Sequence, residues 1–229
     1  MKTIIILSFF FFLTVEQVSA QKQVKIGKQV WMVENLQVDT FRNGDPITWA
    51  QTAAEWKKAG ENKQPAWCYY EARRYAGDTN TMMQNGLQYG KLYNWYAVND
   101  PRGLAPVGWH VPSKAEWQAL ENHLGGSRKA ALKMRLKKDW REDDKGNNRS
   151  GFTALPGGYR SDFSFHGKGT TGYWWTSTEE PENDNPRDPV NAILSFHRLT
   201  SRYYLDFGTG GRNTHFHYQD GLSVRCIKD

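Results

Sequence analysis

Apolar residues recur with helical spacing in the middle of the chain. Trp117, Leu120 and Leu124 lie three and four positions apart, which places them on one face of a helix. Ser113 and Glu116 stand where a capping box begins a helix, and a glycine pair follows Leu124 where helices commonly end. This pattern predicts an amphipathic helix over residues 114–124.

Three further segments have helical features. Thr52 and Glu55 form a second capping box, which predicts a short helix to about Gly60. Residues 129–138 carry two leucines one turn apart, which predicts another helix. Residues 89–98 are rich in leucine and aromatic residues and fit either a helix or a buried strand. We expect a helix there.

Strand patterns dominate the second half of the chain. One earlier alternation, over residues 24–32, predicts a β-hairpin, because Gly27 followed by Lys28 suits a two-residue turn. From Gly151 onward, aromatic and β-branched runs between glycine-rich turns predict antiparallel strands at residues 152–155, 172–178, 190–199, 201–207, 214–218 and 222–227. Helices that precede strands, rather than alternating with them, indicate an α+β fold.

The N-terminus has the pattern of an export signal. A short basic stretch precedes an apolar run, and small residues follow where a signal peptidase cleaves. The run is too short for a membrane span, which takes about 20 residues. Gln21 stands in place of the cysteine that a lipid anchor needs. We therefore expect residues 1–20 to be a cleavable signal peptide and residues 21–229 to be a single released domain, secreted or periplasmic.

The composition suits one folded, basic domain. Aromatic residues make up 14% of the 229 residues, which supplies core material and excludes a disordered chain. The net charge of +6 is scattered along the sequence, and its densest run, residues 128–138, is typical of the solvated face of a helix. We therefore expect no nucleic-acid partner and, after removal of the signal, no membrane span.

The chain has two cysteines, Cys68 and Cys226. An even number in an exported protein favours one disulfide, with two buried free thiols as the alternative. The absence of a Cys-x-x-Cys motif argues against a zinc knuckle or a dithiol redox site. We expect a Cys68–Cys226 disulfide that ties the segment after the first helix to the final strand.

Six ordered blocks of sequence carry a family resemblance. They lie at residues 31–36, 89–98, 104–117, 150–160, 172–179 and 223–226. Together they resemble the Fibrobacter succinogenes major paralogous domain family of bacterial exported proteins, over about residues 24–228. That family is distantly similar to the C-type-lectin-like fold. The resemblance implies a twisted antiparallel sheet with two or three helices, mostly in the N-terminal half, and chain ends that lie close together.

Known catalytic patterns match the chain poorly. Formylglycine-generating enzymes, which share the C-type-lectin-like fold, use a pair of thiols near their C-terminal region, where this chain has Cys226 alone. No Gly-x-Ser-x-Gly motif marks a hydrolase nucleophile. A carboxylate pair for glycoside hydrolysis depends on spacing in space rather than in sequence, so it stays open.

Two segments contain potential metal ligands. His215 and His217 lie two apart, on one face of a strand, and with His197 could hold a transition metal; three ordinary histidines are the alternative. The acidic loop at residues 179–185 offers oxygen ligands for calcium, but a solvated loop is the simpler explanation. We expect no metal and no cofactor.

These observations favour a secreted, non-enzymatic binding or adhesion module. The strand-rich stretch over residues 160–220 would present tyrosine, arginine, histidine and asparagine, which combine contact area with hydrogen bonding. The candidate ligand-binding residues are Arg198, Arg202, Tyr204, Arg212, His215 and His217. The partner would be an extracellular glycan or protein. The alternatives are an enzyme of the formylglycine-generating-like superfamily, a glycan-active hydrolase, and a structural component of the cell surface.

Overall fold

The computed structural model describes residues 21–71, 79–136, 138–140, 146–181, 192–200, 205–207 and 216–229. For residues 79, 180–181, 192–200 and 205–207 it describes the backbone alone. The expected signal peptide, residues 1–20, lies outside these ranges. Within them, no helix has the length and apolar character that crossing a membrane requires.

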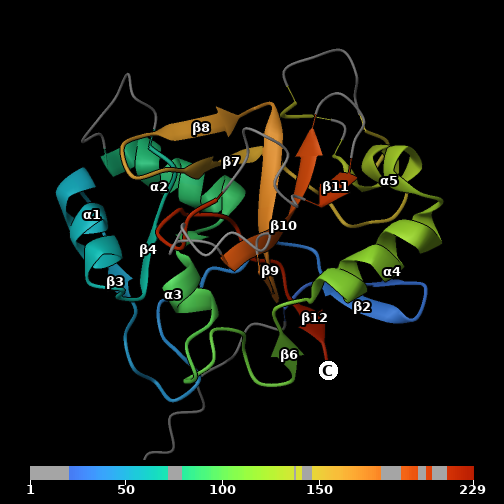
Figure 1. The fold of residues 1–229 in the computed structure, drawn as a ribbon. Helices are drawn as coiled ribbons and strands as arrows, with labels where there is room; N and C mark the ends of the chain where they lie inside the picture. The colour runs from blue at the N-terminus through green and yellow to red at the C-terminus, as the bar shows by residue number, and fades with distance from the viewer. Residues whose placement is uncertain are drawn as a thin grey trace, which may run out of the picture.

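Five helices occur in the described ranges, all in the first 134 residues. They are α1 (Ala53–Glu61), α2 (Thr79–Tyr89), α3 (Trp95–Val98), α4 (Lys114–Leu124) and α5 (Ser127–Met134). Figure 1 shows α1 and α2 on one side of the molecule and α4 and α5 on the other, with strands between them. This placement agrees with an α+β fold, but the five helices exceed the two or three that the family resemblance implied.

The described strands form three small sheets rather than one large one. The first has the order β1 (Gln23–Ile26), β2 (Gln29–Met32), β12 (Ile227–Lys228), β6 (Trp109–His110). The second has the order β11 (Leu205–Phe207), β10 (Ala192–Thr200), β9 (Thr171–Pro181), β7 (Gly157–Arg160), β8 (Phe165–Lys168). The third has the order β3 (Thr48–Trp49), β4 (Ala66–Cys68), β5 (Leu92–Tyr93).

The predicted hairpin and the predicted long helix are both confirmed. Strands β1 and β2 pair antiparallel, and Gly27 takes the positive φ of 62° that the two-residue turn needs. Ile227 of β12 pairs with Trp31 of β2, so the two ends of the described chain share a sheet. Helix α4 has Ser113 as its N-cap with a complete capping box, and it ends at Gly125 with φ 98°.

The expectation of one helix over residues 89–98 is wrong. Helix α2 ends at Tyr89, and Gly90 takes a φ of 80° that turns the chain out of the helix. Leu92 and Tyr93 then pair with β4, and Asn94 caps the short helix α3 by accepting a hydrogen bond from the Ala97 amide. The apolar residues are buried because β4 and the core cover them, not because they share a helix face.

Other predicted boundaries also need correction. Helix α5 ends at Met134, and the Arg135 side chain is 0% exposed, so residues 128–138 are not simply a solvated face. Residues 152–155 form no strand beyond a single bridge between Ala154 and Arg135. The described part of the predicted strand 214–218, residues 216–218, is also not a strand. The sheets are not purely antiparallel, because β3 pairs with β4, and β7 with β9, in parallel.

Strand β9 divides the core into two parts. Neighbouring residues of a strand face opposite sides of the sheet. Trp174 accordingly packs with Trp117 of α4 and Ala131 of α5, whereas Trp175 packs with Tyr93 and Trp95. A third cluster lies beneath α1 and includes Trp56, Cys68 and Tyr70.

A buried polar network joins three distant segments of the chain. The Asn35 Oδ1 atom accepts hydrogen bonds from Trp174 Nε1 at 2.8 Å and from Arg225 Nε and Nη2 at 2.9 and 2.7 Å. Arg225 Nη1 donates to backbone carbonyls, among them that of Phe152 at 2.6 Å. Burial lowers the pKa of Arg225 to about 9. The network explains why these residue types stand in separate sequence blocks.

The predicted disulfide is wrong. Cys68 and Cys226 are both free thiols, and both are fully buried. Cys68 on β4 belongs to the cluster beneath α1, whereas Cys226 belongs to the cluster around Tyr93 and Trp175. Burial raises the pKa of Cys68 to about 11 and that of Cys226 to about 12. Each cysteine therefore acts as a small apolar side chain of its own cluster.

Candidate functional site

Five aromatic side chains lie together at the surface beside the five-stranded sheet that contains β9, which we call the central sheet. We call them the tyrosine-rich face: Tyr96, Tyr159, Tyr173, Phe216 and Tyr218. They come from α3, β7, β9 and residues 216–218. Each ring is partly buried, and four of the five pack on the core cluster that contains Trp175. The face therefore packs on the core on one side and is partly exposed to solvent on the other.

Three of the rings meet edge to face. Tyr159 lies 5.0 Å from Tyr173 and 4.8 Å from Phe216, with interplanar angles of 71° and 85°. Tyr173 and Phe216 lie 5.3 Å apart at 65°. Such pairs contribute about 0.5–1.5 kcal/mol beyond simple burial. The triad is therefore a rigid group rather than a set of independent side chains.

The two remaining rings form a stacked pair. Tyr96 and Tyr218 lie 6.0 Å apart with an interplanar angle of 20°. The Trp95 amide donates to the Tyr218 carbonyl at 2.9 Å, which fixes α3 against this segment. Phe216 of the triad and Tyr218 of the pair are two positions apart, and both pack on the core cluster that contains Trp175.

The β7–β8 hairpin positions Tyr159. Gly158 has a φ of 68°, and a Cβ atom there would lie 2.2 Å from the His166 carbonyl oxygen, so only glycine fits. The His166 ring lies 5.0 Å from that of Tyr159 at 27°. Ser161 and Ser164 hold His166 through hydrogen bonds of their hydroxyls to Nε2 at 3.2 and 2.7 Å. These serines orient the imidazole against the face.

Three hydroxyls of the face are available to a ligand. No protein group in the described ranges hydrogen-bonds the hydroxyls of Tyr96, Tyr159 or Tyr218. Burial raises the pKa of all three, helped by Asp162 for Tyr96 and by Glu179 for Tyr218. The hydroxyls therefore stay protonated at neutral pH and can donate as well as accept hydrogen bonds.

Carboxylates lie along one border of the face. Asp220 is only 4% exposed, and its Oδ2 atom accepts the His217 amide at 2.8 Å. Burial raises the pKa of Asp220 to about 7, against the opposing effect of that hydrogen bond and with a further rise from Asp162. Asp162 is hydrogen-bonded to Gln219. The acidic border disfavours an anionic ligand at this surface.

The comparison with protein families agrees with the sequence blocks. A family model described as Fibrobacter succinogenes major domain matches residues 24–228. The chain belongs to this family. The family predicted from the sequence is thus confirmed. No curated protein and no solved structure matches the chain significantly.

Most of the predicted ligand-binding residues of this Fibrobacter succinogenes major domain lie outside the described part. Arg202, Tyr204, Arg212 and His215 fall there, and for Arg198, on β10, only the backbone is described. His217 is described, and its side chain is exposed between Phe216 and Tyr218. The structure thus brings one predicted residue to the tyrosine-rich face and leaves the other five untested.

Sequence reasoning missed the five rings of the face. Two signals pointed to them. Tyr159 follows the glycine pair of one block, and Tyr173 alternates with Trp174 at the spacing of a strand whose two sides differ. Tyr96, Phe216 and Tyr218 gave no such signal, because their positions depend on contacts between distant segments.

The two potential metal sites that the sequence offered find no support among the described residues. No group of three or more histidine, cysteine, aspartate or glutamate side chains in these ranges is placed to hold an ion. Only the backbone of His197 is described, and His215 lies outside the described residues. Glu179, the first residue of the acidic loop, lies on β9 and accepts a hydrogen bond from Trp95 Nε1 at 2.9 Å. Its carboxylate therefore has a structural partner.

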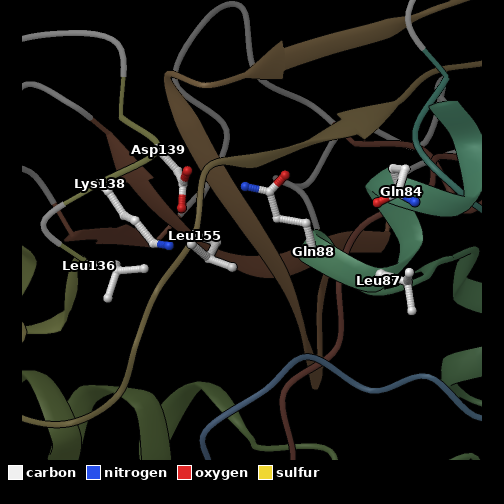
Figure 2. Close-up of a pocket in the computed structure, with 7 residues that line it drawn as sticks. All are labelled: Gln84, Leu87, Gln88, Leu136, Lys138, Asp139 and Leu155. Carbon is white, nitrogen blue, oxygen red and sulfur yellow. The ribbon is translucent and has the colours of Figure 1, made fainter.

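Two adjoining pockets lie away from the face. The larger, of about 480 Å³, lies between α2 and the segment after α5 (Figure 2), with Gln84, Leu87 and Gln88 on one side and Leu136, Lys138, Asp139 and Leu155 on the other. The second, of about 320 Å³, shares Leu87, Gln88 and Leu155 and reaches Asn35 and Arg225. Those two side chains already hydrogen-bond each other. Lys22 and Glu34, which also line the second pocket, form an ion pair of their own.

Proposed function

We propose that this domain is a secreted binding or adhesion module that contacts its ligand through the tyrosine-rich face. The observation that carries the proposal is the set of five rings, four of them packed on one core cluster, with three available hydroxyls. Tyrosine combines a large rigid contact area with a polar tip at low cost in conformational entropy. Rings that are already fixed lose little further freedom when a ligand binds.

The proposal includes export and a C-type-lectin-like fold. The apolar N-terminal run supports export to the periplasm or the medium. Two features support the fold relation: β2 and β12 bring the described ends of the chain together, and helices flank the central sheet. The ligand is an extracellular glycan or protein of neutral or cationic character, because Asp162, Glu179 and Asp220 border the face.

The enzymatic alternatives are weaker. A formylglycine-type oxidase needs two thiols that act together, whereas Cys68 and Cys226 lie in separate clusters and have raised pKa values. The specific observation that favours a glycan-active hydrolase is the proximity of Asp162 to the buried Asp220, whose pKa of about 7 suits a general acid. That acid is 4% exposed, which limits its access to a glycosidic bond. A purely structural surface component would differ by having no saturable ligand.

The proposal is tested on an array that carries glycans and peptides. Residues 21–229 are applied beside a Tyr96→Ala/Tyr218→Ala variant. We expect at least one saturable signal from the wild type and a signal at least tenfold lower from the variant, since truncation of central aromatic anchors typically costs 2 kcal/mol or more. Val107→Ala, at a side chain that is 83% exposed elsewhere, is the matched control and should bind like the wild type.

Two results would overturn the proposal. One is the absence of any saturable signal from the wild type, which would favour a structural component. The other is an equal signal from the double variant with an unchanged melting temperature, which would place the binding surface elsewhere. Release of product from an arrayed glycan would favour the hydrolase.

A further inference from the structure

A second aromatic group lies on the short sheet β3–β4–β5, away from the tyrosine-rich face. Trp49 of β3 is 36% exposed, and its ring stacks on that of Trp67 with centroids 5.2 Å apart and an interplanar angle of 2°. Trp67 is only 5% exposed, and its Nε1 atom donates to the Ile47 carbonyl at 3.1 Å. One face of the Trp49 indole is thus fixed on a buried ring, and the other is open.

Further contacts hold the stack rigid. Tyr69 packs edge-on against both indoles, at 5.2 Å from Trp67 and 6.1 Å from Trp49. Gly86 lies inside α2, where glycine is unfavourable, but a Cβ atom at that position would lie 2.4 Å from the Tyr69 ring. The helix therefore contains a glycine where Tyr69 needs room. The Trp49 ring is consequently held in place before any ligand arrives.

One positive and one negative group lie near the Trp49–Trp67 stack. The Lys91 ammonium lies 3.6 Å from the centroid of the Trp67 ring. The stacked Trp49 occupies one face of Trp67, which leaves the other face for this ammonium. The ammonium is 3.8 Å from the Asp39 carboxylate, whose side chain is 71% exposed. Lys91 disfavours a second cation over Trp49, and Asp39 disfavours an anion beside it.

We propose that Trp49 is a platform for one pyranose ring of a neutral polysaccharide. The C–H face of a pyranose is apolar and matches a single exposed indole, whereas its hydroxyls need polar groups at the edge. Asp39 can accept such hydrogen bonds: its backbone carbonyl accepts the Ile47 amide at 2.7 Å just before β3, and its carboxylate is exposed. Aromatic platforms with a few polar groups are the usual composition of small-ligand sites. A polysaccharide chain carries many pyranose rings, so the weak contact of one ring with Trp49 can form again with another ring of the same chain.

The test is affinity electrophoresis of residues 21–229, run toward the cathode because the protein is basic. The gels contain hydroxyethylcellulose, galactomannan, arabinoxylan or laminarin, and a parallel gel contains anionic alginate. We expect at least one neutral polymer to retard the wild type, and we expect alginate, which attracts the net charge of +6, to retard the wild type and Trp49→Ala equally. Trp49→Ala should raise the apparent Kd at least tenfold, and Trp49→Phe should retain part of the retardation. Val107→Ala should behave as the wild type.

The outcomes separate this site from the tyrosine-rich face. The Tyr96→Ala/Tyr218→Ala variant should keep its retardation in the same gels, whatever its behaviour on the array. No retardation by any of the four neutral polymers overturns the platform, as does unchanged retardation of Trp49→Ala. Retardation that Trp49→Ala loses in alginate but keeps in every neutral polymer also overturns it. Melting temperatures of the Trp49 variants within a few degrees of the wild type show that loss of binding is not loss of folding.

Discussion

At the scale of single residues, the unusual groups are two buried ionisable side chains that have no ion-pair partner among the described residues. Asp220 and Arg225 are both at most 4% exposed, and burial shifts the pKa of each toward its neutral form. Asp220 lies beneath the segment that carries Phe216 and Tyr218, and Arg225 lies in the network that joins Asn35 and Trp174. The Asp220 carboxyl lowers the stability of the fold at neutral pH. The Arg225 guanidinium stabilises the fold only while its hydrogen-bond partners, among them Asn35, are present.

Asp220→Asn should stabilise the protein at pH 8. The folded pKa of about 7 exceeds the ordinary value of 3.8, so the wild type loses stability as pH rises between these values. A difference of about three pKa units corresponds to roughly 4 kcal/mol, and asparagine keeps an acceptor for the His217 amide without the charge. Urea unfolding should show the variant at least about 2 kcal/mol more stable at pH 8 and the two proteins converging near pH 4. A variant that is less stable at pH 8 would contradict the assignment.

Asn35→Ala should destabilise the protein by about 3–5 kcal/mol. The substitution removes the common acceptor of Trp174 and Arg225 and leaves a buried guanidinium with fewer partners. Asn43→Ala, at an exposed position whose side chain makes two local hydrogen bonds with Asp45, is the matched control and should cost less than about 1 kcal/mol. Equal free energies of unfolding for the two variants would remove the network as a stabilising feature.

At the scale of elements, α4 joins local sequence signals to a distant part of the fold. Glu116 closes the capping box with Ser113 and also accepts a hydrogen bond from His110 Nε2 at 2.8 Å. The other nitrogen of that ring lies 2.7 Å from Asp229. The start of the helix is thus linked to β6 and to the C-terminal segment through one imidazole.

Ser113→Ala should destabilise the protein by about 1 kcal/mol. The serine hydroxyl accepts the Glu116 amide at 3.3 Å and donates to the Glu116 carboxylate at 2.8 Å. Ser177→Ala, at an exposed position of β9, removes a hydroxyl without a cap and should be nearly neutral. Thermal midpoints of both variants check this, and equal midpoints would mean that the cap contributes nothing.

The contribution of His110 should depend on pH. Its pKa is raised above 6.5 because Glu116 and Asp229 outweigh the opposing effect of burial. The stabilisation is therefore complete below pH 6.5 and is lost as pH rises through the folded pKa. The difference in unfolding free energy between the wild type and His110→Asn should be larger at pH 6 than at pH 9, because all other groups titrate in both proteins. A difference that grows with pH would reverse the assignment.

At the scale of the whole molecule, the sequence predicts elements that are set by neighbouring residues and misses features that depend on contacts between distant segments. The α4 helix and the first hairpin are set by neighbouring residues, so their signals can be read directly. Residues 89–98 fail because β5 forms only when β4 is beside it. The rings of the tyrosine-rich face come from segments that are far apart in sequence, so no periodicity could show that they meet. The disulfide fails because two cysteines and export do not determine a distance.

The thiols give a direct check of the three-part core. The native protein should react with a thiol reagent only slowly, because both cysteines are buried and their raised pKa values disfavour the thiolate. In guanidinium chloride without reductant, two thiols per chain should titrate. If no thiol titrates until a reductant is added, the two cysteines form a disulfide and the account of two free thiols is wrong.

The central claim is that the tyrosine-rich face binds a ligand, and one calorimetric titration tests it most directly. The ligand with the strongest signal on the array is titrated into the wild type and into Tyr96→Ala/Tyr218→Ala at the same pH and salt concentration. The face predicts saturable binding to the wild type and a Kd at least tenfold higher for the variant, with both proteins folded. Equal Kd values for the two folded proteins would contradict the claim.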